Sequence, residues 1–213
     1  MLLDAAESQL VLIDYQPRLM PAMADGAGVL ANALRLARAA RALQVPIHAT
    51  EQNPQRLGET DPALRAEVLG AHGSVLAKMD FSAVPAGLGD RLRPPAPRGG
   101  GGGGGRGGNA RSLPRHLQRA EPEAPAGGRE CIVVAGCEAH VCLLQTALDL
   151  LEMEFEVWVV TDACASRTER SRDAAFDRLA GNGAELVTTE MVVFEWLRTA
   201  EHPQFKTLQA LIR

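Results

Sequence analysis

Short apolar runs alternate with longer segments of helical periodicity along most of the chain. Six runs have the length of buried strands, and the segments that follow most of them repeat apolar residues at helical spacing. The expected strands are residues 9–13, 46–49, 74–77, 131–135, 155–160 and 185–188. The expected helices are residues 29–44, 62–69, 140–153, 168–181, 191–198 and 203–212, with Thr189 as the N-cap of the helix at 191–198. This alternation predicts an α/β fold in which a parallel, doubly wound sheet is covered by helices on both faces.

One segment, residues 94–128, breaks the alternation. It contains seven consecutive glycines at 99–105, two more after Arg106, and a cluster of prolines. Such a composition buries too little apolar surface to offset the entropy of ordering the chain. We therefore expect a mobile, low-complexity surface loop inside a single domain that spans residues 1–213.

The same region is rich in arginine, which leaves a nucleic-acid tether open as an alternative. The arginines are Arg91, Arg93, Arg98, Arg106, Arg111, Arg115 and Arg119. The aromatic side chains on which such tethers stack bases are missing from it. The whole chain has 22 basic and 26 acidic residues and a formal net charge of −4, so it lacks the cationic field that holds nucleic acid or an anionic membrane.

Composition also bears on the cellular compartment. Hydrophobic residues make up 46% of the 213 positions, yet no apolar run reaches the roughly 18 residues of a membrane span. The first nine residues carry Asp4 and Glu7 where an export signal has basic residues. Four cysteines in such a chain are more typical of free thiols than of a disulfide framework. We expect a soluble, cytoplasmic protein.

Three reactive side chains lie at or just after the carboxyl ends of expected strands. Asp14 follows the first strand, Lys78 follows the third, and Cys142 lies in the opening turn of the helix after the fourth. Ligands of an open parallel sheet bind at this edge, where the strand order reverses. We expect the helix N-terminus and the ammonium to lower the pKa of Cys142, and Asp14 to act as general acid and base. Gly136 permits a tight turn that lets amides near Glu138 and Cys142 face an oxyanion, which suits acyl transfer through a thioester.

Each of these residues also has a purely structural interpretation. An aspartate after a strand can cap a turn, a lysine can be a solvated surface charge, and a cysteine can be a small buried hydrophobe. By that reasoning Cys131 and Cys164 belong to the core. A zinc site at Cys137, His140 and Cys142 does not fit the spacing of zinc sites, which pair cysteines as Cys-x2-4-Cys and need a distant second pair of ligands.

Three ordered motifs give the chain a specific resemblance to a known family. They are LIDYQ at 12–16, KMDFSA at 78–83 and VAGCEAHVCLLQTA at 134–147. Together they resemble the isochorismatase-like cysteine hydrolases, and more narrowly the isochorismatase-domain-containing, YcaC-like branch. The resemblance extends from residue 10 to about residue 197 and omits the glycine-rich segment. It implies a three-layer α/β/α sandwich around a six-stranded parallel sheet.

The resemblance also implies roles for individual residues. The family's general acid/base aspartate falls on Asp14, its catalytic lysine on Lys78 and its nucleophilic cysteine on Cys142. The family keeps a cis peptide a few residues before the nucleophile. In this chain that bond joins Cys137 to Glu138 and is expected to aim the Glu138 and Cys142 amides as an oxyanion hole.

Two departures from related enzymes narrow the expected reaction. Residues 51–54 read EQNP and lack the Asp-x-His pattern by which nicotinamidases of the family bind zinc, so we expect no metal and no cofactor. Isochorismatases proper lack the cysteine nucleophile, so Cys142 argues against vinyl-ether hydrolysis.

The expected function is therefore that of a metal-independent hydrolase of a small amide or related C–N bond. Leu19, Gln52 and Phe81 are expected to line its pocket. Members of the family commonly self-associate, so we expect a homo-oligomer, a dimer or larger. A catalytically silent protein that serves in binding or assembly is the alternative from a different functional class.

Overall fold

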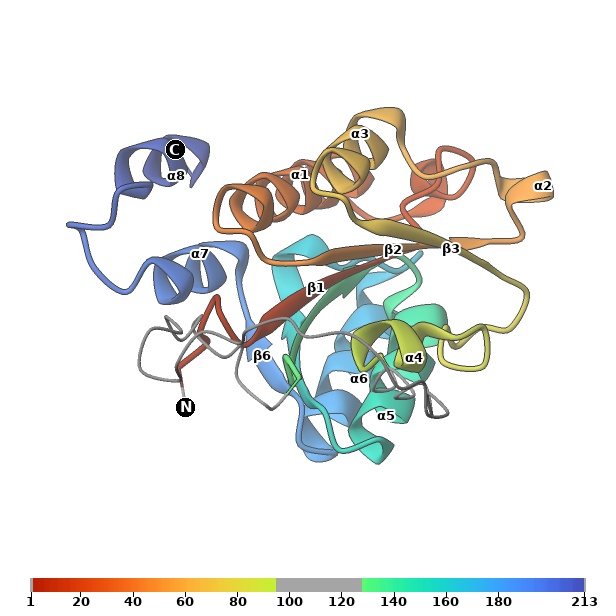
Figure 1. Cartoon of the computed structure of the whole chain (residues 1–213). Helices are drawn as coiled ribbons and strands as arrows, with labels where there is room; N and C mark the ends of the chain where they lie inside the picture. Colours follow the sequence, from red (N-terminus) through yellow and green to blue (C-terminus); the bar gives the residue numbers. More distant parts are fainter. Residues whose placement is uncertain (1, 95–127, 213) are drawn as a thin grey trace, which may run out of the picture.

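Six parallel strands form one sheet in the order β3-β2-β1-β4-β5-β6 (Figure 1). The computed structural model describes residues 2–94 and 128–212. The strands are β1 (Ser8–Ile13), β2 (Ile47–Gln52), β3 (Ser74–Lys78), β4 (Cys131–Gly136), β5 (Glu156–Val160) and β6 (Glu185–Val187). Each lies where the apolar runs predicted a strand, and the α/β class and six-stranded parallel sheet are confirmed.

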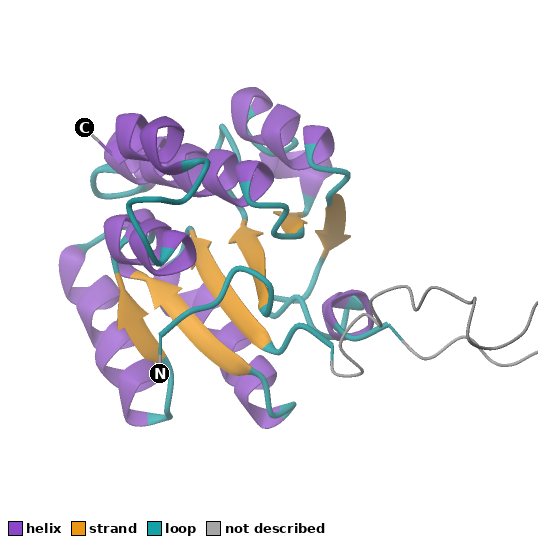
Figure 2. Ribbon diagram, turned by 60° about the vertical axis from the view of Figure 1, so that its left-hand side comes forward, coloured by secondary structure: helices purple, strands orange, loops and turns teal. Residues whose placement is uncertain are grey.

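Helices cover both faces of the sheet and complete a three-layer arrangement (Figures 1 and 2). The helices are α1 (Gly26–Ala42), α2 (Pro54–Leu57), α3 (Pro62–Gly70), α4 (Leu88–Leu92), α5 (Leu144–Glu152), α6 (Glu169–Gly181), α7 (Thr189–Leu197) and α8 (Phe205–Ile212). Figure 1 shows α1 and α3 on one face and α5 and α6 on the other. Helix α1 also contacts α7 and α8. Among the residues that the structure describes, no helix has both the length and the apolar character that crossing a bilayer requires.

The two central strands, β1 and β4, are buried along their whole length. This burial explains why their sequences are almost uninterrupted apolar runs, since a strand covered on both faces has no solvent side for polar residues. The face of α1 that packs inward carries small residues, including Ala33, Ala37 and Ala40, which are buried. Small side chains let the helix approach the sheet closely.

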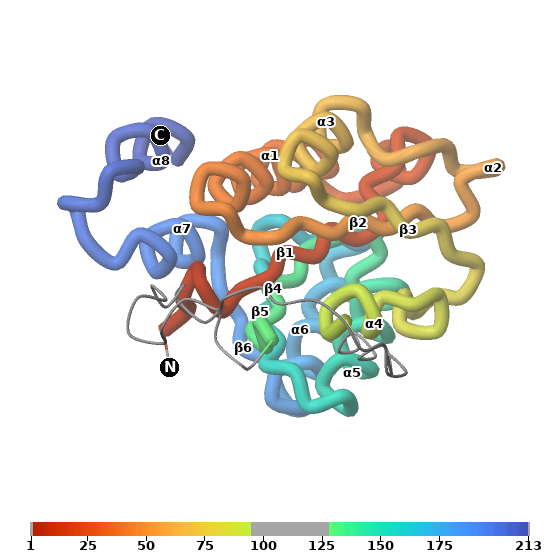
Figure 3. Tube along the Cα trace, viewed as in Figure 1, coloured from red at the N-terminus to blue at the C-terminus, as the bar shows by residue number. Residues whose placement is uncertain are grey.

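The strand order reverses between β1 and β4. The chain passes from β1 to β2 and β3 on one side, then returns beside β1 and continues through β4, β5 and β6 on the other (Figure 3). Ile13, the last residue of β1, is in register with Thr50 on one side and Gly136 on the other. The residues that follow Ile13 and Gly136 therefore lie close together at the carboxyl edge, where parallel sheets bind their ligands.

The expected N-cap of α7 was wrong, and one expected helix has an irregular first turn. The N-cap of α7 is Thr188, whose hydroxyl accepts a hydrogen bond from the Met191 amide, because Thr189 is already helical and donates its own hydroxyl proton to Asp162 Oδ1 at 2.9 Å. The helix expected at 140–153 begins instead as a π-helical turn, Ala139–Leu143, and continues as α5. The sequence reading also missed the short helix α4.

The glycine-rich stretch between residues 94 and 128 lies outside the described residues, apart from its two ends. The segments that flank it are held together at the amino edge of the sheet. Gln9 Nε2 donates to the carbonyls of Leu92 and Arg129, at 2.8 Å each. Arg93 forms a two-bond ion pair with Glu130. The Gln9 side-chain amide thus links Leu92 and Arg129, which lie on either side of the glycine-rich stretch.

We expect that residues 95–127 can be replaced by a glycine–serine linker of about eight residues with a gain in stability. Closing a shorter flexible connection costs less entropy, and about a fourfold shortening is worth roughly 1 kcal/mol in the free energy of unfolding. Urea titration of the full chain and the shortened chain measures the difference. A loss of several kcal/mol on shortening would mean that residues 95–127 contribute to the folded core, which contradicts the prediction.

Candidate active site

Asp14 directly follows the last residue of β1, at the point where the strand order reverses. Its backbone adopts a left-handed conformation with φ of 56°, which aspartate tolerates better than most residues. Its carboxylate is completely buried and accepts two hydrogen bonds, from Thr50 Oγ1 to Oδ1 at 2.7 Å and from Lys78 Nζ to Oδ2 at 2.8 Å. Neighbouring strands supply both donors, because Thr50 belongs to β2 and Lys78 ends β3.

The Lys78 ammonium is held by four oxygen atoms. Besides Asp14 Oδ2, it donates to Gln52 Oε1 at 2.7 Å, the Phe81 carbonyl at 3.0 Å and the Asp80 carbonyl at 3.3 Å. An ammonium has three protons, so this set of oxygens engages all of them. Its side chain is also fully enclosed. Lys78 can therefore stabilise negative charge nearby, but it has no proton left to donate to a ligand.

Gln52 is fixed in turn by Gln16, two residues after Asp14. The Gln16 side chain accepts from the Gln52 amide at 2.9 Å and donates to the Gln52 carbonyl at 3.0 Å, much as a neighbouring strand does. Gln52 Nε2 donates to the Met79 carbonyl at 2.8 Å. Every polar atom of the Gln52 side chain is thus paired, and its carbonyl oxygen is directed at Lys78.

Cys142 lies in the π-helical turn that follows β4. Gly136, the last residue of β4, lets the end of this strand lie close to β1, since a Cβ at that position would lie 2.6 Å from Ile13 Cβ and 2.8 Å from the Ile13 carbonyl oxygen. Single π-helical turns are rare and frequently occur at functional sites. The Cys142 side chain is almost entirely buried, with the residue 4% exposed, and it lies close enough to interact with both Asp14 and Lys78.

Burial raises the pKa of the Cys142 thiol to about 12. Burial is the largest cause of this rise; the Asp14 carboxylate contributes to it through its charge and a hydrogen bond, and the Lys78 ammonium opposes it. The expectation of a lowered pKa was therefore wrong, because burial and the carboxylate together outweigh the ammonium. At neutral pH the group is a thiol, with the base that can remove its proton beside it.

Comparison with known proteins places the chain in a family. The family model described as the isochorismatase domain matches residues 8–92 and 124–191. Isochorismatase domain-containing protein 2 of Pongo abelii is 35% identical over 206 residues, which cover 97% of this chain and 83% of the relative.

The chain belongs to the isochorismatase family. Family membership indicates, in general terms, a hydrolase. Among solved structures, the MAR1 ribonuclease of Caenorhabditis elegans superimposes with a TM-score of 0.80 at 28% identity and covers 100% of this chain and 92% of that one. The YcaC gene product of Escherichia coli, described as an octameric hydrolase of unknown specificity, has a TM-score of 0.72 at 21% identity and covers 99% and 95% of the two chains.

The peptide bond that the isochorismatase resemblance suggested as cis is trans. No cis peptide bond occurs in residues 2–94 or 128–212, so the bond between Cys137 and Glu138 does not provide the expected bend. Instead, Glu138 turns the chain with a left-handed φ of 55°. Its carboxylate is paired with Arg167 through two hydrogen bonds, at 2.8 and 3.1 Å, and the Ala139 amide donates to the Ala165 carbonyl.

The other residues expected at the site differ in whether they contact Lys78. Gln52 contacts Lys78 directly. Phe81 contributes its carbonyl, but its side chain is 54% exposed, and Leu19 is partly buried against the core. The Cys137 thiol is directed at Met20, with 3.2 Å between the sulfur atoms.

Sequence reasoning missed Thr50 and Gln16 as partners of this site. Strand alternation was the available signal for Thr50, because residues 50 and 52 share one face of β2.

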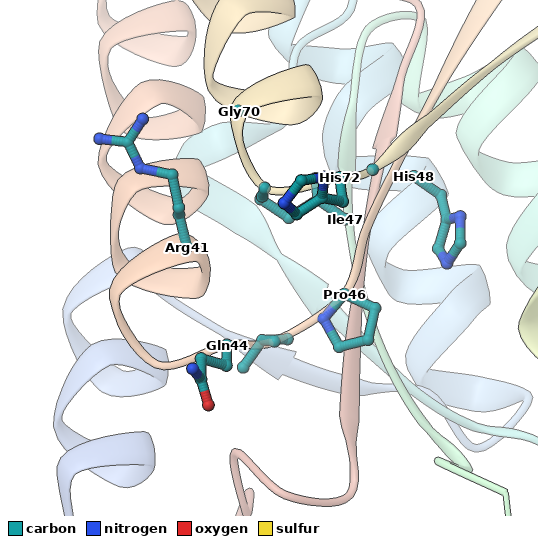
Figure 4. Close-up of a pocket in the computed structure, with 10 residues that line it drawn as sticks. Arg41, Gln44, Pro46, Ile47, His48, Gly70 and His72 are labelled. Atoms are coloured by element: carbon teal, nitrogen blue, oxygen red, sulfur yellow. The ribbon is translucent and has the colours of Figure 1, made fainter.

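Two cavities lie at opposite edges of the sheet. A groove of about 750 Å³ runs between Pro54 of α2 and Met79 after β3, and it reaches Lys78. A second cavity of about 520 Å³ lies at the amino end of β2, lined by Arg41, Gln44, His72 and others, and contains none of the three reactive residues (Figure 4). Within the described part of the chain, no group of three or more His, Cys, Asp or Glu residues is placed to hold a metal ion.

Replacing Asp14 by Asn is expected to make the Cys142 thiol more reactive at neutral pH. Loss of the carboxylate leaves the Lys78 ammonium as the nearest charge, so the pKa of Cys142 falls and its alkylation at neutral pH accelerates. Lys78→Met should have the opposite effect on the pKa. The pH dependence of iodoacetamide modification of Cys142, followed by peptide mass spectrometry, measures both.

Thermal unfolding of each variant serves as the control, because breaking a buried ion pair costs about 3–5 kcal/mol. Shifts of the same sign in the two folded variants would contradict the charge assignment.

Proposed function

We propose that this chain is a metal-independent cysteine hydrolase that cleaves a small amide or a related C–N bond. One observation carries the proposal: three strands and a helix bring Asp14, Lys78 and Cys142 into one buried cluster at the point where the strand order reverses. A thiol, a carboxylate and a fixed ammonium are the parts that acyl transfer to a cysteine requires.

In the proposed reaction, Asp14 takes the thiol proton as Cys142 Sγ attacks the substrate's carbonyl carbon. A C–S bond forms, and the carbonyl oxygen becomes an oxyanion, whose stabilisation we assign to the Glu138 and Cys142 amides of the turn after β4. The C–N bond then breaks as Asp14 returns the proton to the leaving amine, and a thioester remains. Water attacks the thioester, with Asp14 again accepting and returning a proton, and the acid product leaves as Cys142 regains its thiol.

Lys78 stays an ammonium throughout this sequence. Its charge stabilises the carboxylate of Asp14 before proton transfer and the developing thiolate during it. Because its three protons are bound to Asp14, Gln52 and the loop carbonyls, we assign it no proton-transfer step. Leu19, Gln52 and Phe81 are the proposed pocket residues.

RNA hydrolysis is a second candidate. The Caenorhabditis elegans neighbour, 28% identical, carries the name ribonuclease. The formal net charge of −4 opposes a strong electrostatic affinity for RNA. The two candidates differ in the expected effect of salt, since phosphate contacts weaken steeply as salt rises, whereas binding of a small neutral amide does not.

We also propose that the protein is a homo-oligomer. The Escherichia coli YcaC neighbour is described as octameric, and Met79 and Phe81 of this chain are large apolar side chains that are 69% and 54% exposed in the single chain. We expect light scattering coupled to gel filtration to give at least twice the 22.7 kDa chain mass. A purely monomeric protein at micromolar concentration would contradict this.

A panel of small amides and a structured RNA, assayed with the wild type and Cys142→Ala, tests the hydrolase assignment. We expect hydrolysis of at least one amide and a loss of at least about a thousandfold in Cys142→Ala, since removing a nucleophile leaves only residual catalysis. Cys131→Ala is the matched control, because Cys131 lies at the opposite, amino end of β4.

Mass spectrometry of the wild type after substrate addition is expected to reveal an acyl adduct on the peptide that contains Cys142. Amide hydrolysis that persists in Cys142→Ala would overturn the mechanism. Binding without turnover would favour the silent binding protein, and RNA cleavage would favour the ribonuclease.

A further inference from the structure

The loop that follows β3 supplies two of the four oxygens around Lys78, namely the carbonyls of Asp80 and Phe81. The large side chains of this loop do little to hold it in place, since Met79 and Phe81 are mostly exposed. The position of these two carbonyls must therefore depend on hydrogen bonds made elsewhere in the loop.

Gln52 holds the start of the loop through the Met79 carbonyl, and α5, the helix that follows the Cys142 turn, holds its far end. The Ala83 amide donates to Thr146 Oγ1 at 3.0 Å, and Ser82 Oγ donates to Asp149 Oδ2 at 2.5 Å. Ala83 and Thr146 are completely buried. A buried amide that loses its acceptor is costly, so the loop is constrained to keep Ala83 against Thr146.

The same Thr146 hydroxyl also reaches the nucleophile. It donates its proton to the Cys142 carbonyl at 2.7 Å, while it accepts from Ala83. A hydroxyl has one proton and two lone pairs, so both bonds form at once. Thr146 therefore joins the main chain of Cys142 to the loop that cages Lys78, and Asp149 lies one turn further along the same helix face.

We propose that Thr146, supported by Asp149, is a positioning residue that holds the Lys78 ammonium at a fixed distance from the Cys142 thiol. This role rests on the proposed cysteine mechanism. It extends that mechanism beyond the three reacting residues to a side chain that touches none of the reacting atoms. Without the Thr146 link, the carbonyls of Asp80 and Phe81 lose their fixed position, and the ammonium moves away from the sulfur.

The test uses Thr146→Val, which keeps the shape of the side chain but removes both hydrogen bonds, and Thr146→Ser, which keeps them. We expect alkylation of Cys142 by iodoacetamide at about pH 9 to slow by about tenfold in Thr146→Val, because the rate follows the thiolate fraction. Thr146→Ser should react as the wild type does. Thr161→Val is the matched control, since it removes a comparable hydroxyl bond, to the Val187 carbonyl at 3.0 Å.

A second pair of variants keeps the test decisive if Thr146→Val does not fold. Asp149→Asn and Asp149→Ala both remove the charge, but only Asn keeps an acceptor for Ser82, so their difference isolates the hydrogen bond. We expect alkylation to be about threefold slower in Asp149→Ala than in Asp149→Asn.

The Asp14→Asn variant is measured in parallel and separates two kinds of failure. If Asp14→Asn changes thiol reactivity while folded Thr146→Val matches the wild type or Thr161→Val, the positioning role is overturned and the cysteine mechanism stands. If neither Asp14→Asn nor Lys78→Met changes the reactivity of the Cys142 thiol, the cysteine mechanism fails, and the positioning role of Thr146 fails with it.

Discussion

The buried ion pair between Asp14 and Lys78 is the contact on which the carboxyl edge of the sheet depends. Both side chains are fully enclosed, and removing two charges from water costs several kcal/mol for each ion. Only a complete set of partners offsets that cost. Thr50, Gln52 and the carbonyls after β3 supply that set. The parallel register of β1, β2 and β3 is therefore as much a requirement of the charges as of the hydrophobic core.

Much of this arrangement could be read from the sequence. The apolar runs located all six strands, and the rule for parallel sheets brought Asp14, Lys78 and Cys142 to one edge. The sequence did not predict how burial, the Asp14 carboxylate and the Lys78 ammonium combine to set the pKa of Cys142. The direction of the Cys142 pKa shift depends on how deeply the thiol is buried relative to the carboxylate and the ammonium. Spacing along the chain carries no information on that depth, so it could not show that burial and the carboxylate outweigh the ammonium.

The supporting residues were hidden for a related reason. Gln16 acts through hydrogen bonds between its side chain and the backbone of Gln52, and Arg167 acts by pairing with Glu138 from a segment far along the chain. Such contacts leave no periodic signature, since any polar residue at either position fits the hydrophobic pattern equally well. The turn at Glu138 is similar: the resemblance implied a cis peptide bond there, but the bond is trans and Glu138 turns the chain with a left-handed φ.

The two hydrogen bonds that the Gln9 side chain donates have a practical consequence. They join Leu92 to Arg129 at the amino edge of the sheet, and the reactive cluster occupies the other edge. The part of the β3–β4 connection that follows Leu92 therefore leaves the described structure and returns to it at adjacent points on the edge opposite Asp14 and Lys78. A foreign peptide, an affinity tag or even a small folded module grafted between these two points would be attached away from the Asp14–Lys78 cluster, which makes them a natural place to engineer the protein.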